Sequence, residues 1–157
     1  MPLTLERTSP TVATVTRHFA APPARLWAVH TDPALLRQWL IGPEGWVMTR
    51  CDVDMRPGGS LRYDWQSADG AQGFYLTADV LDVEAPHRIL HVERMFLPDQ
   101  TPDNTVETRF IADGSGTRMV MTMTVEAAET MDAMLATGMT DGMEASYARL
   151  ERGYLAA

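Results

Sequence analysis

The sequence contains no lysine, and all 13 of its basic residues are arginine. This absence excludes a Schiff-base lysine, a P-loop lysine and every other lysine nucleophile. The single cysteine, Cys51, cannot form an internal disulfide or build a cysteine metal site. No apolar run approaches the roughly 18 residues of a membrane span. Glu6 and Arg7 interrupt the N-terminal stretch where a signal peptide needs an apolar core. We therefore expect a cytoplasmic protein without a membrane span.

The charge balance and the missing motifs narrow the classes of partner. The net charge of −8 disfavours nucleic acid as a partner. The sequence has no His-x-His, His-Glu-x-x-His or EF-hand spacing, which predicts no metal site. It also has no glycine-rich dinucleotide or phosphate loop. We expect no cofactor, and 157 residues fit about one domain.

The first third of the chain predicts a strand and two short helices. Val12–Phe19 is rich in β-branched residues, which favour a strand. Pro23–His30 has a proline near its first turn and places Leu26, Trp27 and His30 on one helical face. Pro33–Trp39 is predicted to be a second short helix, closed by Gly42-Pro43.

The rest of the chain predicts a sheet followed by a helix. Between Trp46 and Val125 the apolar residues recur with period two and are separated by short turns, which favours antiparallel hairpins. Ala127–Leu155 has apolar residues at helical spacing and predicts one long helix. The layout is α+β. The strands expected here are Leu61–Trp65, Phe74–Val83, Arg88–Phe96, Thr105–Ile111 and Thr117–Val125.

Five segments together resemble a known protein family. Arg17–Pro22 resembles the family's opening R-x-F-x-A-P, and Asp54–Gly59 resembles its D-x-R-x-G-G turn. Residues 31–43 resemble a T-D-P stretch that ends in a tryptophan and Gly-Pro. Residues 86–93 are similar to a P-x-R-I/L-V-H/F-T-E strand, and residues 116–119 with 138–150 to the closing strand and helix. The chain is identified as a member of the START-like, Bet v 1-like superfamily (SRPBCC). Within it, the resemblance is to the family of the activator of the 90-kDa heat-shock-protein ATPase (C-terminal domain).

This resemblance implies a helix-grip fold. In that fold a curved antiparallel sheet wraps around a long C-terminal helix, and two short helices follow the first strand. We expect residues 12–157 to form this single domain after an N-terminal tail of residues 1–11. The resemblance also implies that the space between sheet and helix is a ligand cavity.

Methionine and aromatic residues are the expected walls of that cavity. Seven of the 11 methionines lie between Met119 and Met143. Met119, Met121 and Met123 alternate on one strand face, where they would face Met139 and Met143 on the helix. Methionine suits adaptable apolar binding, although it also fills ordinary cores. The expected wall residues are Trp39, Tyr63, Trp65, Phe110, Met121 and Met143.

His91 and Glu93 are the expected polar anchor and the candidate catalytic residues. They lie two residues apart and so share one face of a strand. Hydrophobicity alone would turn Leu90 and Val92 inward and leave His91 and Glu93 in solvent. The family alignment instead implies that His91 and Glu93 face the cavity, and we favour it. Such a pair could act as a general acid and base, or be only a structural contact.

Arginines are the other candidates for ligand contact. Arg17, Arg56, Arg62 and Arg118 could each hold a ligand carboxylate if they faced the cavity. Surface ion pairing with the 21 acidic residues is the alternative explanation.

Three functions remain open. The first is a protein that binds an apolar or amphipathic small molecule between sheet and helix. The second is a cyclase- or hydrolase-like enzyme that uses His91 and Glu93 in the same cavity. The third, which only the resemblance implies, is a stress-related co-chaperone of the 90-kDa heat-shock protein. A homodimer is compatible with each of them.

Overall fold

The computed structural model describes residues 2–42 and 44–155. Within these residues, eight strands form one antiparallel sheet in the order β1-β2-β8-β7-β6-β5-β4-β3. Pro43, expected to help close the second helix, lies outside the described residues. The elements are β1 (Thr4–Ser9), β2 (Val12–Phe19), α1 (Pro23–Thr31), α2 (Pro33–Trp39), β3 (Trp46–Val53), β4 (Ser60–Ser67), β5 (Gly73–Glu84), β6 (Arg88–Phe96), β7 (Asn104–Asp113), β8 (Gly116–Thr124), α3 (Ala128–Ala136) and α4 (Met139–Gly153).

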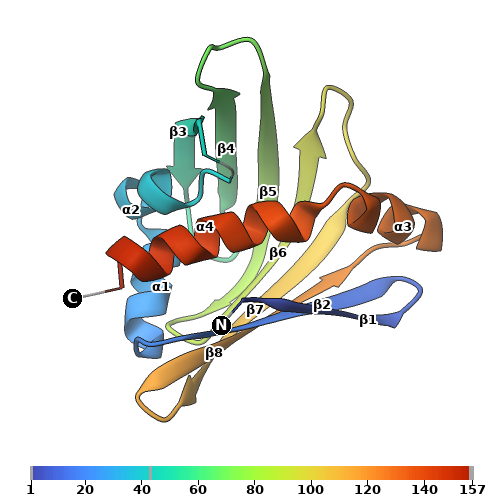
Figure 1. Ribbon diagram of the computed structural model, residues 1–157. Coiled ribbons are helices and arrows are strands. Elements are labelled where there is room, and N and C mark those ends of the chain that lie inside the picture. Colours follow the sequence, from blue (N-terminus) through green and yellow to red (C-terminus); the bar gives the residue numbers. More distant parts are fainter. Residues whose placement is uncertain (1, 43, 156–157) are drawn as a thin grey trace.

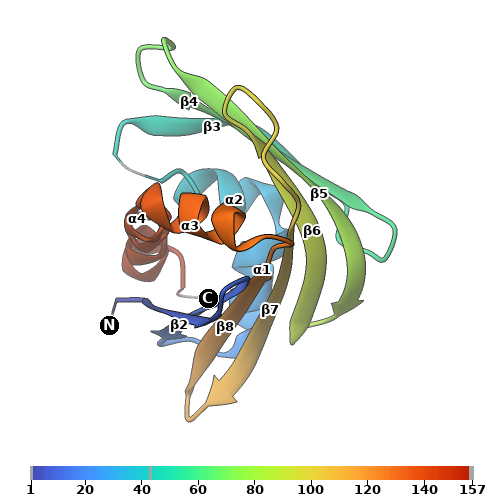
Figure 2. The same ribbon diagram turned by 90° about the vertical axis from the view of Figure 1, so that its right-hand side faces the viewer.

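The sheet is curved, and α4 runs across its concave side (Figure 1). Figure 2 shows the strands bending around α3 and α4, with α1 and α2 on the same side of the sheet. Strands β3 to β8 follow one another as hairpins, and β8 then pairs with β2. Short turns such as the one at Gly114, with φ of +62°, make these antiparallel connections possible. The predicted α+β helix-grip fold is confirmed.

The N-terminal segment is more ordered than a tail. Residues 4–9 form β1, which pairs with β2 and places Leu5 opposite Val15. The Arg7 guanidinium contacts the Asp132 carboxylate of α3 at 2.6 Å. The sequence did not predict this strand because only its pairing with β2 and the contact with α3 define it.

The C-terminal helix is interrupted, so the expectation of one helix over Ala127–Leu155 was wrong. Helix α3 ends at Ala136, and α4 begins at Met139 and is 15 residues long. Gly138 between them has φ of +74°, a left-handed conformation that glycine adopts without steric cost. The break lets α3 change direction and pack beside β1, while α4 crosses the sheet.

Candidate functional site

A cavity of about 560 Å³, here called the main cavity, lies between the sheet and α4. Strands β3 to β8 and helices α1, α2 and α4 contribute to its walls. Most of the lining side chains are apolar. A largely apolar cavity with a few polar groups is the usual form of a small-molecule site. The polar or titratable side chains among them are His30, Tyr63, His91, Glu93, Thr108, Thr137, Ser146 and Tyr147.

The structure brings most of the sequence-predicted residues together around this cavity. Eight residues are expected at the cavity, namely the six wall residues together with His91 and Glu93. The seven of them that line it are Trp39, Tyr63, Trp65, His91, Glu93, Met121 and Met143. They come from α2, β4, β6, β8 and α4, elements that are far apart in the sequence. Met123 and Met139 line it as well, so both expected methionine walls are present.

Phe110 and Met119 are placed differently from the prediction. Phe110 is 1% exposed and is not part of the cavity lining. Its ring packs against Trp27 and His30 of α1, with centroids 6.3 and 4.9 Å away. Met119 is fully buried in the same hydrophobic core. Helix α1 covers this end of the sheet, and therefore these two side chains fill core space rather than the cavity.

The two wall tryptophans present only apolar surface to the cavity. Trp39 Nε1 donates to the Val29 carbonyl and Trp65 Nε1 donates to the Leu40 carbonyl, each at 2.8 Å. Because both indole donors are satisfied by the backbone, these rings offer packing area and no hydrogen bond to a ligand.

His91 and Glu93 form a pair on the cavity wall. Strand β6 has the orientation that the family alignment implied, since the side chains that line the cavity are those of Ile89, His91, Glu93 and Met95. His91 Nε2 lies 2.8 Å from Glu93 Oε1, and the side chains are 13% and 23% exposed. His91 Nδ1 is buried without a hydrogen-bond partner in the described part of the chain. The pair is therefore partly accessible and not fully satisfied.

Two tyrosines stand near this pair. Burial raises the pKa of Tyr63 and of Tyr147 well above the ordinary value, and the negative charge of Glu93 acts in the same direction. Both phenols therefore stay protonated at neutral pH. A protonated phenol can donate one hydrogen bond and accept others, so the two tyrosines add polar capacity to the cavity.

His30 is a cavity residue that sequence reasoning did not select. Its Nδ1 donates to the Leu26 carbonyl at 2.7 Å, and its Nε2 is buried without a partner among the described residues. Burial lowers the pKa of His30 to about 4, so the imidazole is neutral at pH 7. The signal was present, because the sequence places His30 on the apolar face of α1 with Leu26.

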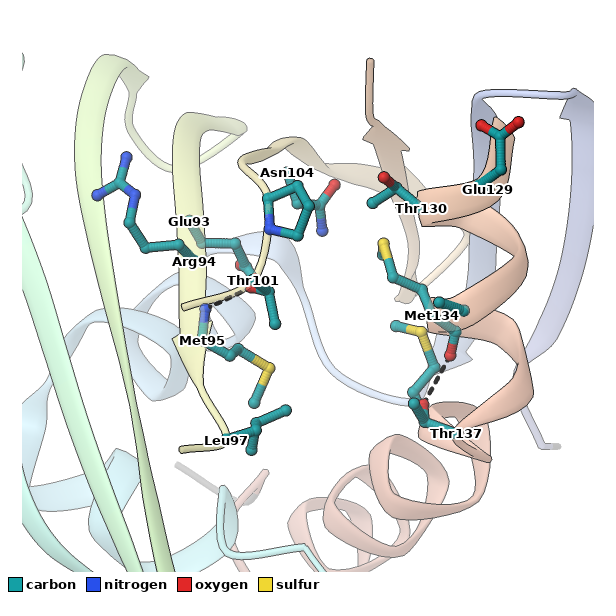
Figure 3. A pocket seen from close by; sticks show the side chains of 13 residues that line it. Glu93, Arg94, Met95, Leu97, Thr101, Asn104, Glu129, Thr130, Met134 and Thr137 are labelled. Atoms are coloured by element: carbon teal, nitrogen blue, oxygen red, sulfur yellow. Dashed lines mark hydrogen bonds between the residues drawn. The ribbon is translucent and has the colours of Figure 1, made fainter. Parts of the chain in front are cut away.

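A second, smaller cavity of about 390 Å³, shown in Figure 3, shares part of its lining with the main one. It lies between the segment that follows β6 and helix α3. Among its other lining residues is Asn104 at the start of β7. The residues that line both cavities are Glu93, Met95, Leu97, Thr137 and Met139. The two cavities therefore meet at the break between α3 and α4.

The candidate arginines do not reach the main cavity. Arg17 points under α4, where its Nε and one terminal nitrogen each lie 2.9 Å from an oxygen of Glu144. Arg56 and Arg62 pair with nearby aspartates, and Arg118 is exposed. The surface ion-pair explanation therefore holds for Arg56 and Arg62, whereas Arg17 is buried and pairs with Glu144 beneath α4. In the part of the chain that the structure describes, no cluster of three or more His, Cys, Asp or Glu side chains is arranged to hold a metal ion.

The curved sheet around α4, with a cavity between them, defines a helix-grip protein of the START-like class. Residues 20–153 match the model of the family described as activator of Hsp90 ATPase homolog 1-like protein. The chain belongs to this family. Among residues 2–42 and 44–155, no helix is both long and apolar enough to cross a membrane.

Solved structures agree with this assignment. A protein from Rhodobacter sphaeroides is 33% identical, with a TM-score of 0.90 and 97% of each chain covered. A protein from Mycobacterium smegmatis is 26% identical, with a TM-score of 0.86 and 99% of each chain covered. An AHSA1-like protein from Aeromonas hydrophila shares the fold at 21% identity, with a TM-score of 0.73 and 91% and 95% of the two chains covered. No functionally curated protein matches the chain.

Proposed function

We propose that this protein binds an apolar or amphipathic small molecule in the main cavity. The observation that carries the proposal is an apolar space of about 560 Å³ with one polar pair, His91 and Glu93, on its wall. A site of this kind gains affinity from buried apolar area, while a few polar groups set the orientation of the ligand. Methionines on two sides allow the walls to adapt to the ligand.

Two glycines of α4 provide a matched test of this proposal. Gly142 lines the main cavity, and a Cβ added there meets nothing within 4 Å. Gly153 in the same helix has equally open surroundings, but it lines neither cavity. Gly142→Phe should therefore fill part of the cavity without disturbing the backbone, whereas Gly153→Phe should add the same side chain outside it.

The measurement is titration with Nile red, a neutral dye whose fluorescence increases in apolar surroundings. We expect saturable binding to the native protein and an affinity at least about tenfold lower for Gly142→Phe, because the added ring occupies space that the dye needs and a loss of about 1.4 kcal/mol is tenfold in affinity. Gly153→Phe should bind the dye like the native protein. Equal binding by both variants would place the dye elsewhere and contradict the proposal.

An enzyme that uses the same cavity is the second candidate. It is favoured by the 2.8 Å contact between His91 Nε2 and Glu93 Oε1 on the cavity wall. A histidine in contact with a carboxylate can move a proton to or from a bound substrate. The assay is hydrolysis of apolar aryl esters, and Glu93→Gln should lower the rate by at least about a hundredfold with an unchanged circular dichroism spectrum. An unchanged rate contradicts this candidate.

The co-chaperone prediction rests on the family description alone. It stays a prediction for this chain, as do the expectations of a cytoplasmic location and of a homodimer. A pull-down with the 90-kDa heat-shock protein tests the first of these, and a stoichiometric complex is the outcome that would support it.

A further inference from the structure

The chemistry of the main cavity narrows the class of ligand, and this step rests on the proposed function. We propose that the ligand is an amphipathic amine, whose protonated nitrogen binds at Glu93 and Asn104 while its apolar body fills the main cavity. The argument comes from the charges that line the cavity, from two adjacent hydrogen-bond acceptors and from the surroundings of Arg94.

Among the lining residues that the structure describes, the main cavity carries one carboxylate and no permanent cation. Glu93 is the only acidic residue among the described lining residues, and no arginine is among them. The protein has no lysine that could take this role. His30 is neutral at pH 7, and His91 is already bonded to Glu93. A ligand carboxylate would therefore meet the Glu93 carboxylate with no arginine or lysine beside it, whereas an ammonium group would be attracted.

Glu93 and Asn104 are neighbours across two strands, and each has an acceptor oxygen without a hydrogen bond among the described residues. They are directly paired across β6 and β7, so their side chains share one face of the sheet. Asn104 is 7% exposed, and its Oδ1 is buried without a partner in the described part of the chain. His91 occupies Oε1 of Glu93, and no hydrogen bond among the described residues reaches Oε2.

These two acceptors call for a donor between them. A buried acceptor without a partner costs free energy. An ammonium group carries three N–H donors and no acceptor, so it can donate to Glu93 and to Asn104 together. A hydroxyl group has one donor and satisfies only one of them, and a carboxylate has none.

The neighbouring charges do not cancel this preference. Glu93 and Asn104 both line the second cavity, which also contains Arg94 in its lining. The Arg94 guanidinium lies 2.9 Å from Asp103 and 3.2 Å from Asp79, and Figure 3 shows it directed away from α3. It is therefore neutralised at the outer surface. The net charge of −8 adds a long-range attraction for cations.

The experiment compares three probes that share one naphthalene ring and one attachment point: naphthylmethylamine, naphthylmethanol and naphthoic acid. Their dissociation constants are measured by isothermal titration calorimetry at neutral pH and moderate salt. We expect the amine to bind at least about tenfold more tightly than the acid, with the alcohol between them. Glu93→Gln should lower the affinity for the amine by about tenfold or more and leave the affinity for the alcohol nearly unchanged.

Two further variants separate the local contact from other effects. Asn104→Asp keeps an acceptor beside Glu93, so the affinity for the amine should be retained or increased. A loss of affinity for the amine in Asn104→Asp would mean that Asn104 does not act as an acceptor for the ammonium group, and it would overturn the proposal. Glu126→Gln removes the same charge from an exposed site outside both cavities. It should leave the affinity for the amine unchanged.

The outcomes distinguish this inference from the proposed function. If the three probes bind with equal affinity, or the acid binds most tightly, the amine proposal is overturned and ligand binding by the cavity stands. The amine proposal is also overturned if Glu126→Gln weakens amine binding as much as Glu93→Gln. If none of the three probes binds while the native protein still binds Nile red, only the amine proposal is overturned; if Nile red does not bind either, the proposed function is contradicted as well.

Discussion

Removing the Glu144 carboxylate from α4 should destabilise the fold strongly. The Arg17 side chain of β2 is 2% exposed and lies beneath α4, where Glu144 binds it through two contacts of 2.9 Å. Glu144 Oε1 also accepts a hydrogen bond from the Leu3 backbone N–H at 2.8 Å. The Glu144 carboxylate therefore connects α4 both to β2 of the sheet and to the N-terminal segment. Glu144→Ala leaves a buried guanidinium without its main partner.

The expected loss in the free energy of unfolding depends on how deeply the ion pair is buried. Removing one partner of a fully buried ion pair costs about 3–5 kcal/mol. Glu144 is 28% exposed, and Glu151 lies 3.4 Å from Arg17, so part of the charge remains compensated. We expect a loss of about 2–3 kcal/mol in the free energy of unfolding. For a chain of this size that corresponds to a decrease of about 6–9 °C in Tm.

The assay is urea unfolding followed by circular dichroism, with Asp132→Ala as the control. Asp132 forms an exposed pair with Arg7 between β1 and α3, and its removal should cost less than about 1 kcal/mol. Adding Arg17→Met to Glu144→Ala should restore part of the lost stability, because no unpaired charge then stays buried. The reasoning is refuted if Glu144→Ala costs no more than Asp132→Ala, or if the added Arg17→Met lowers stability further.

Three further predictions concern helix glycines, pH and thiol reactivity. Gly142→Ala should stabilise the fold by about 0.5–1 kcal/mol in urea unfolding, because the added Cβ meets nothing within 4 Å. Gly138→Ala should destabilise the fold, because φ at Gly138 is +74°. The opposite order of stabilities would contradict the assignment of the helix break. His30 has a pKa of about 4 in the folded protein and 6.5 as its reference value, so between these values the unfolded chain binds more protons and stability falls as pH falls. This should cost up to about 3 kcal/mol from pH 6.5 to 4, and His30→Phe should show a correspondingly smaller decrease, whereas equal slopes would argue against a buried neutral His30. Burial raises the pKa of Cys51 to about 11, so Ellman's reagent at pH 8 should label it only as fast as the protein unfolds, and fast labelling would contradict its burial.

Local pattern was sufficient for most of the elements. The predicted strands Val12–Phe19 and Arg88–Phe96 have the observed bounds, because alternating and β-branched residues act through neighbours in the sequence. Helix α2 was also predicted with the observed bounds, since Asp32 and Pro33 mark its start. The helix break at the left-handed Gly138 was not predicted, because apolar residues at helical spacing lie on both sides of it. Hydrophobic periodicity carries no information on the φ angle of a single residue.

The residues of the candidate site could be predicted only in part from the sequence. The row of methionines in β8 indicated a wall, but Met119 is fully buried in the core and only Met121 and Met123 line the cavity. The inward frame of β6 came from the family alignment rather than from hydrophobicity, since His91 and Glu93 are more polar than Leu90 and Val92. A polar pair inside an apolar cavity violates the local pattern, and such violations are expected at functional sites.

The sequence by itself determined the α+β class, the order of the main elements, the family and the absence of lysine chemistry. These properties depend on composition and on residues close together in the chain. Only the tertiary structure decided which side chains share the cavity, that Phe110 does not, and that Glu93 and Asn104 stand side by side. Strand register and the placement of helices over a sheet are non-local, so no local pattern specifies them. The proposed preference for an amine ligand depends on this second kind of information.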